Sequence, residues 1–223
     1  FWLPLIPLAA CAFHAAYAVA QSYPSKPIRL IVPYPPGGAN DNIARPLVHK
    51  LTESLGVQVI QDAAHFTGPR TLVAGGVEIT ARRFVIATGS SAFVPPIPGL
   101  KDVPYLTNET MFDLTEAPSH LIVIGAGPIG IEMAQAHRRL GAKVSVLEMS
   151  AMMPKDDPEA VAVVRERIRA EGVEVLEGIK VKGIARDGNA IAVTIEEAGR
   201  ERAIVGTHLL VAAGRRANVT GLG

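Results

Sequence analysis

The stretch from Leu121 to Glu148 combines an apolar run, a glycine-rich turn, a helical pattern and a second apolar run that ends in an acidic residue. The turn has the spacing G-x-G-x-x-G, at Gly125, Gly127 and Gly130. A strand before this spacing, a helix after it and an acidic residue at the end of the next strand are together typical of a dinucleotide-binding unit. This context favours a dinucleotide site over an ordinary glycine-rich turn with a surface glutamate.

Each residue of the turn has a predicted task. Gly125 allows the tight turn out of the strand, Gly127 lets the backbone approach a pyrophosphate, and Gly130 lets the helix pack closely on the sheet. Pro128 suits the first helical turn, and the helix N-terminus offers N–H donors to phosphate. Glu148 is expected to accept hydrogen bonds from the adenosine ribose and to repel a 2′-phosphate, so NAD is favoured over NADP.

Composition excludes several classes of function. The 223-residue chain is 48% apolar, which suffices for one large domain or two small ones. Its net charge of +1, without a basic stripe interleaved with aromatic residues, gives no reason to expect nucleic acid as a partner. Cys11 is the only cysteine, so an intramolecular disulfide, a redox dithiol and a multi-cysteine metal site are excluded.

Histidine and methionine residues form no metal-binding pattern. The histidines are dispersed without ligand spacing. Met149, Met152 and Met153 cluster after Glu148, but no second group of soft ligands accompanies them. We therefore predict no metal ligand and expect the three methionines to pack within a loop.

The residues after this cluster carry one helix signal and several strand signals. Asp157 and Pro158 predict a helix start, the spacing of Val161 and Ile168 predicts its buried face, and Gly172 predicts its end. Strands are predicted at residues 173–176, 181–185, 191–195 and 208–212.

Residues 1–20 are apolar, rich in alanine and free of acidic and basic side chains apart from one histidine. A bacterial export signal is the favoured interpretation, because Ala18-Val19-Ala20 forms a small-x-small cleavage pattern. A lipoprotein cleavage site ending at Cys11 ranks second. A membrane-spanning helix ranks third, because the run is short and contains prolines. We expect no stable membrane span in the mature form, and we expect the chain to be a piece of a longer protein with a truncated end at 218–223.

Residues 22–61 predict a strand at 28–32, a Pro/Gly loop, a helix at about 42–55 and a strand at 57–60. The segment YPSKPIRLIVPYPPGG resembles the mature N-terminus of the solute-binding proteins of tripartite tricarboxylate transporters. By that resemblance, the loop at 34–38 and the helix start near Asp41 would line a site for a small carboxylate.

The sequence from about residue 62 follows a different pattern. A strand, a hairpin turn at Gly75-Gly76 and a longer strand lead to Ala87-Thr88-Gly89, and the chain closes with Ala213-Gly214-Arg215 and the residues after it. Together with the turn at Gly125, these motifs resemble the pyridine nucleotide-disulfide oxidoreductase family, close to its mercuric reductase and dihydrolipoamide dehydrogenase branch. The resemblance covers nearly three quarters of the chain.

The resemblance implies roles for matching residues. Thr88 and Gly89 would approach FAD from the end of the flavin domain, and Gly214 would lie beside the cofactor. Glu132 matches a glutamate near the flavin, whose lysine partner belongs to a segment missing here. Pro128 stands where many members have a tyrosine that covers the flavin, so this gating is not expected. No catalytic residue is assigned. The cofactor-binding set is Gly125, Gly127, Pro128, Ile129, Gly130, Glu148, Gly214, Thr88, Gly89 and Glu132.

Several family features have no match in this sequence. The first G-x-G-x-x-G, which binds FAD, should precede residue 62, and the family's C-x-x-x-x-C redox pair is absent. The homodimer domain would follow Gly223. FAD is therefore implied by the family although its main binding segment is missing. We expect the chain to be the NAD(H)-binding portion of an enzyme that transfers hydride between NADH and flavin, and to be incomplete as a catalyst alone.

The predicted fold class is α/β: a Rossmann-like three-layer NAD-binding domain, a partial flavin-domain remnant and an N-terminal βαβ stub. Whether the chain is itself an enzyme stays open, although the family favours an FAD/NAD-dependent oxidoreductase. The alternative function is an exported periplasmic module that binds small carboxylates. Localisation is cytoplasmic by the oxidoreductase family and periplasmic if the leader is genuine.

A gene fusion or an assembly error near residue 61 is expected to have joined two fragments. The predicted domains are 1–20 (leader), 22–61 (solute-binding-like), 62–113 (flavin-domain segment), 114–217 (NAD-binding) and 218–223 (truncated end).

Overall fold

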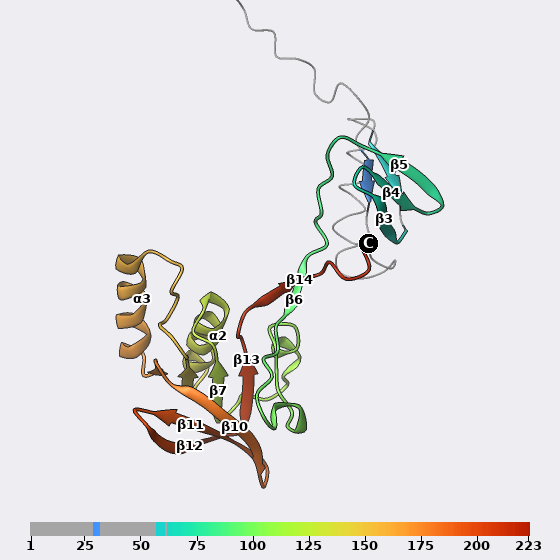
Figure 1. Ribbon diagram of the computed structural model, residues 1–223. Coiled ribbons are helices and arrows are strands. Elements are labelled where there is room, and N and C mark those ends of the chain that lie inside the picture. Colours follow the sequence, from blue (N-terminus) through green and yellow to red (C-terminus); the bar gives the residue numbers. More distant parts are fainter. Residues whose placement is uncertain (1–28, 32–56, 61) are drawn as a thin grey trace, which may run out of the picture. The chain divides into compact units, whose positions relative to one another are not determined.

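The computed structural model describes residues 29–31, 57–60 and 62–223 (Figure 1). The predicted leader, the loop at 34–38, Asp41 and the helix at 42–55 lie outside these residues. The chain divides into two compact units, residues 1–86 with 220–223 and residues 87–219. Residues 87–113 therefore share a unit with the predicted NAD-binding segment. The predicted domain limits themselves stay predictions.

The first unit contains short strands. β1 and β2 pair in parallel, and β3, β4 and β5 form an antiparallel sheet in that order. The predicted hairpin turn at Gly75-Gly76 is confirmed, because both glycines have positive φ and the flanking strands pair. The longer strand expected before Ala87 is wrong, since β5 ends at Thr80 and Val85 is 92% exposed. The strands are β1 (Arg29–Ile31), β2 (Gln58–Ile60), β3 (Ala64–Gly68), β4 (Thr71–Ala74) and β5 (Val77–Thr80).

The second unit is built on a parallel sheet of four strands in the order β13-β7-β8-β9. Helix α2 connects β7 to β8, and helix α3 connects β8 to β9. Asp157 caps α3, because its Oδ1 accepts from the N–H of Glu159 at 2.9 Å, as the sequence predicted. The elements are β7 (His120–Ile124), α2 (Pro128–Arg139), β8 (Lys143–Leu147), α3 (Pro158–Ala170), β9 (Glu174–Leu176) and β13 (His208–Val211).

An antiparallel meander of three strands covers the other face of this sheet (Figure 1). Its first two strands were predicted. The third, β12, was missed, because its charged and apolar residues do not alternate clearly and it lies at the edge of the meander. The strands are β10 (Lys180–Asp187), β11 (Ala190–Glu197) and β12 (Arg200–Gly206).

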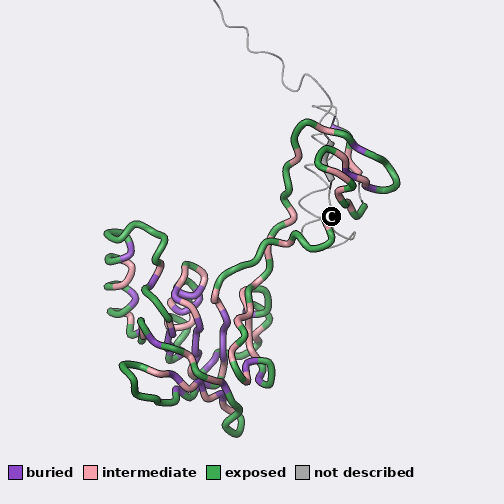
Figure 2. Tube along the Cα trace, in the orientation of Figure 1, coloured by how far each residue is buried: buried purple, intermediate pink, exposed green. Residues whose placement is uncertain are grey.

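The central strands are buried on both faces, as Figure 2 shows by their purple colour. Successive residues of a strand point to opposite faces. Leu121 and Val123 of β7 pack with the helix residues Ile131 and Ala134. Ile122, between them, packs with the meander residues of a second cluster. The helices, the parallel sheet and the meander thus form three layers, which confirms the predicted α/β Rossmann-like fold.

The remaining elements of the second unit are short. β6 (Ser90–Ala92) pairs antiparallel with β14 (Arg215–Ala217), although the two strands are far apart in the sequence. Two short 3₁₀ helices, η1 (Leu100–Asp102) and η2 (Met111–Asp113), lie in the connection from β6 to β7. Within the described residues, no helix is long and apolar enough to cross a membrane.

Candidate dinucleotide-binding site

The predicted site residues lie at one edge of the parallel sheet. β7 runs into Gly125, β8 runs into Glu148, and β13 runs into Ala212. Because the strands are parallel, their carboxyl ends meet at the same edge. The Ala212 N–H donates to the Ile124 carbonyl at 2.8 Å, which fixes the end of β13 beside the glycine turn.

Two of the three glycines are required by the backbone. Gly125 has φ +105°, and a Cβ there would collide with the carbonyl oxygen of Ala212. A Cβ on Gly130 would collide with the carbonyl oxygen of Gly125 and lie 3.5 Å from the Ala212 side chain. Gly130 therefore lets the first turn of α2 close onto the glycine turn and the end of β13.

Gly127 stands in a different environment. It precedes α2 with an extended backbone, φ −72° and ψ 177°, which any residue adopts. A Cβ built on it would meet no atom within 4 Å, so the turn borders open space at this point. Pro128 is the first residue of α2 and Ile129 packs partly against the core. No side chain of the described residues caps this end of the helix.

The carboxylate of Glu148 is half-buried and bonded at both oxygens. Oε2 accepts from the N–H of Ala126, inside the glycine turn, at 2.8 Å. Oε1 accepts from the N–H and the hydroxyl of Ser150, each at 2.9 Å. The main chain of Glu148 is fixed as well, since its N–H donates to the Leu176 carbonyl at 2.8 Å. Glu148 thus ties the end of β8 to the glycine turn.

The loop after Glu148 closes on the same turn. Met153 donates its N–H to the carbonyl oxygen of Ala126 at 3.1 Å, and Met152 is buried. Both methionines pack in the core formed with α2 and α3, which confirms the predicted loop packing for them. For Met149 the expectation is wrong, because this side chain is 72% exposed.

The other two motifs lie together at the pair of β6 and β14. The hydroxyl of Thr88 donates to the Asn218 carbonyl at 2.5 Å, and the Asn218 N–H donates to the Gly89 carbonyl at 3.0 Å. Gly214 has φ +115°, and its carbonyl accepts from the N–H of Phe93 at 3.0 Å. Sequence reasoning did not single out Asn218, whose contacts depend on this long-range pairing.

Glu132 lies apart from these contacts, exposed on the surface of α2. The described residues contain no group of three or more metal-ligating side chains, and no metal ligand was predicted from the sequence. A shallow hollow of about 390 Å³ is lined by Arg138, Arg139, Arg167 and Glu171. It lies at the C-terminal end of α2, opposite the end that follows the glycine turn.

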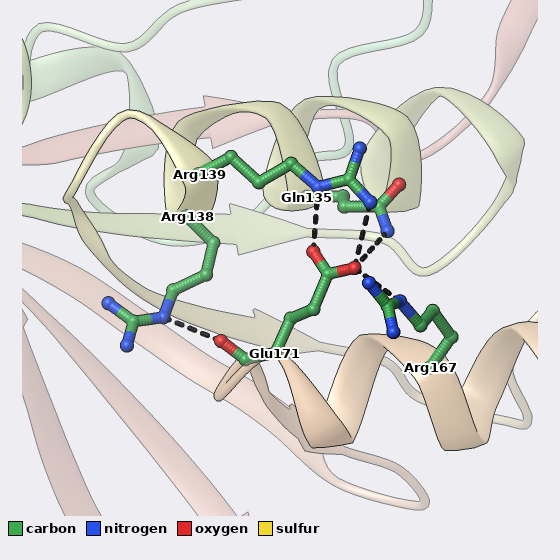
Figure 3. A network of polar contacts seen from close by, with 5 residues as sticks. All are labelled: Gln135, Arg138, Arg139, Arg167 and Glu171. Atoms are coloured by element: carbon green, nitrogen blue, oxygen red, sulfur yellow. Dashed lines mark hydrogen bonds and ion pairs between the residues drawn. The ribbon is translucent and has the colours of Figure 1, made fainter.

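Figure 3 shows the polar network around this hollow. Glu171 accepts from Arg139 at 2.8 Å and from Arg167 at 2.6 Å, and its side chain is 13% exposed. The hydrogen bond from Arg139, supported by that from Arg167, lowers the pKa of Glu171 to about 2 against the opposing effect of burial. The network joins the C-terminal ends of α2 and α3 and does not include the glycine turn.

Known proteins resemble this chain over most of its length. The family profile described as pyridine nucleotide-disulphide oxidoreductase matches residues 8–222. A mercuric reductase of Bacillus cereus is 35% identical over 173 residues, which are 77% of this chain and 27% of that protein. A dihydrolipoyl dehydrogenase of Thermus scotoductus is 36% identical over 177 residues, 75% of this chain and 37% of that protein. The chain thus spans about a third of the length of these relatives.

Solved structures agree with the sequence comparison. The HOCl-induced flavoprotein disulfide reductase RclA from Escherichia coli superposes with a TM-score of 0.64 at 30% identity, over 82% of this chain and 42% of that one. LpdA from Mycobacterium tuberculosis gives a TM-score of 0.65 at 27% identity with the same coverage. The resemblance of residues 22–61 to solute-binding proteins stays a prediction.

Proposed function

Since this chain belongs to the pyridine nucleotide-disulphide oxidoreductase family, we propose that residues 114–217 are its NAD(H)-binding portion. Members of the family depend on FAD and NAD(P). In this proposal NAD binds at the carboxyl edge of the sheet β13-β7-β8-β9. The reaction that this portion serves is hydride transfer between NADH and flavin.

The observation that carries the proposal is the uncapped N-terminus of α2 beside open space. The first N–H groups of a helix have no partner inside the helix and lie at its positive end. At α2 no side chain of the described residues occupies this position, and Gly127 adds no side chain of its own. A pyrophosphate placed there would accept from these N–H groups without displacing any protein group.

Glu148 is the residue proposed to bind the adenosine ribose of the cofactor. A carboxylate has about four acceptor positions on its two oxygens. Ala126 and Ser150 use three of them in this structure. One acceptor position remains for a ribose hydroxyl, and the Ser150 hydroxyl can rotate to bond a second ribose hydroxyl. The negative charge would repel a 2′-phosphate, so we propose NAD as the preferred dinucleotide over NADP.

The contacts of Thr88, Gly89 and Gly214 support a second, finer proposal. Their motifs come together at β6 and β14, beside the end of β13. We propose that this pair of strands, with Glu132, faces the flavin of the family reaction. A single cysteine cannot form a redox pair within this chain. The chain is therefore proposed to bind dinucleotide without completing the reaction by itself.

Calorimetric titration of the full chain with NAD tests the main proposal. We expect saturable binding of NAD, with NADP weaker. A folded chain without detectable heat at about 1 mM NAD, the upper end of ordinary cofactor affinities, would exclude the proposal. Citrate serves as a second titrant: saturable citrate binding without NAD binding would favour the alternative carboxylate-binding function.

A further inference from the structure

Glu177, immediately after β9, reaches the dinucleotide site through a chain of hydrogen bonds. Its Oε1 accepts from the N–H of Met152 at 2.7 Å. The next residue, Met153, donates its N–H to the carbonyl of Ala126 at 3.1 Å, and Ala126 donates in turn to Glu148. Two hydrogen bonds, one at Met152 and one at Met153, therefore connect Glu177 to the glycine turn.

The loop segment that Glu177 holds has an unfavourable backbone. Met153 has φ +47°, a left-handed conformation that is uncommon for a residue with a side chain. Such a residue persists where its surroundings fix it. Met152 is only 1% exposed, so leaving its N–H without the Glu177 acceptor would lower the stability of the folded chain. The Glu177 bond thus supplies the acceptor for Met152 and fixes the backbone immediately before Met153.

The second oxygen of the same carboxylate is held from α3. Oε2 of Glu177 accepts from Arg165, and Arg169 lies 3.5 Å away. The Glu177 side chain is 20% exposed and the Arg165 side chain is 27% exposed. Because one oxygen is fixed by α3, the other is directed at Met152. The carboxylate thereby orients the loop relative to the helix.

We infer that Glu177 is a positioning residue for the dinucleotide site, acting through Met152 and Met153 on Ala126 and Glu148. The inference rests on the function proposed above. Removing the carboxylate frees the loop, and the loop then no longer fixes the Ala126 carbonyl. The glycine turn consequently becomes less ordered before ligand binds, and NAD affinity falls.

Glu171 provides a matched control. It is also a glutamate with two arginine partners, Arg139 and Arg167, and it also joins α3 to the rest of the unit. Its hydrogen-bond partners include neither the glycine turn nor the loop at 149–153. A loss of stability alone should therefore appear in Glu171→Ala as well, whereas a loss of NAD affinity should not.

The experiment compares Glu177→Ala, Arg165→Gln and Glu171→Ala in the full chain. NAD dissociation constants are measured by calorimetry, and amide hydrogen exchange is followed at Ala126 and Met153. We expect NAD binding to weaken about three- to tenfold in Glu177→Ala and about two- to threefold in Arg165→Gln. In Glu171→Ala it should change less than about twofold. Both amides should exchange faster in Glu177→Ala and, to a smaller extent, in Arg165→Gln, but not in Glu171→Ala.

Equal changes in NAD affinity in Glu177→Ala and Glu171→Ala would overturn the inference. If Glu177→Ala does not fold, Arg165→Gln against Glu171→Ala gives the same comparison. If the unaltered chain binds no NAD, the proposed function fails, and hydrogen exchange alone decides on Glu177. Faster exchange at Ala126 and Met153 would then support its positioning role, and unchanged exchange would refute it.

Discussion

The amide of Ala126 donates to the Glu148 carboxylate at 2.8 Å, so the residue proposed to bind ribose also fixes the turn proposed to bind pyrophosphate. The two predicted features of the site are therefore one connected unit. A change at Glu148 is expected to affect both the selectivity for the dinucleotide and the order of the glycine turn.

Glu148→Arg tests the selectivity. The change removes the acceptor for the ribose and the negative charge that repels a 2′-phosphate, so we expect NAD binding to weaken about 10- to 100-fold. NADP should gain relative to NAD. Titrations with both dinucleotides give the ratio, and Glu148→Gln, which keeps an acceptor oxygen, should lie in between. An unchanged ratio in Glu148→Arg would contradict the role of Glu148 in selectivity.

Alanine at Gly130 should mainly lower the stability of the chain, whereas alanine at Gly127 should mainly lower its affinity for NAD. Gly130→Ala brings a Cβ against the Gly125 carbonyl, so we expect a loss of about 1–3 kcal/mol in the free energy of unfolding. Gly127→Ala meets no atom and keeps an ordinary backbone, so it should cost no more than about 1 kcal/mol, the preference for glycine over alanine at the N-cap of a helix.

Gly127→Ala should instead weaken NAD binding, because its methyl group enters the space proposed for the pyrophosphate. Urea denaturation and NAD titration separate the two effects. Normal NAD affinity in a stable Gly127→Ala protein would place the pyrophosphate elsewhere.

Acid should destabilise the chain through Glu171. Its pKa is lowered from 4.5 to about 2 in the folded state, chiefly by Arg139. A lowered pKa means that the unfolded chain binds more protons between these values, so stability is present above about pH 4.5 and is lost as the pH falls toward 2. Thermal unfolding between pH 2 and 6 should show a shallower pH dependence in Glu171→Gln. The same slope in both proteins would argue against the coupling to Arg139.

His120 should make the stability of the chain depend on pH in a different range from that of Glu171. Burial, and then the charge of Lys143, lower its pKa below 6.5. Its Nε2 lies 3.0 Å from the hydroxyl of Ser145, which donates to Glu174 at 2.7 Å. The contribution to stability is complete above about pH 6.5 and declines as the pH falls below that value, because protonation favours the unfolded chain.

Thermal unfolding of His120→Gln between pH 5 and 8 checks this expectation. The variant should lose part of the pH dependence that the unaltered chain shows in this range. An NMR titration of the His120 ring gives its pKa directly. A value at or above 6.5 would contradict the effect of burial.

Local patterns in the sequence were sufficient to predict the elements at the centre of the second unit. The spacing of Gly125, Gly127 and Gly130 predicted the turn between β7 and α2, and Asp157 predicted the start of α3. These features depend on residues within one or two helical turns of each other. The edge strand β12 was missed because an exposed edge requires little apolar alternation.

Contacts between distant segments could not be predicted in this way. Asn218 bonds to Thr88 and Gly89 only because β6 pairs with β14. Glu177 meets Met152 only because β9 lies beside β8 in the sheet. Glu177 belongs to no motif, and Asn218, although it lies in the closing segment after Arg215, has no local signal that points to these partners.

The sequence by itself therefore determined the alternation of strands and helices, the glycine turn and the acidic residue after β8, because steric demands on the backbone and burial periodicity are local. The tertiary structure alone decided which groups bond to that turn. Glu148, Met153 and, through Met152, Glu177 reach it because the order of the parallel strands places their chain ends at one edge, and that order depends on packing of the whole unit.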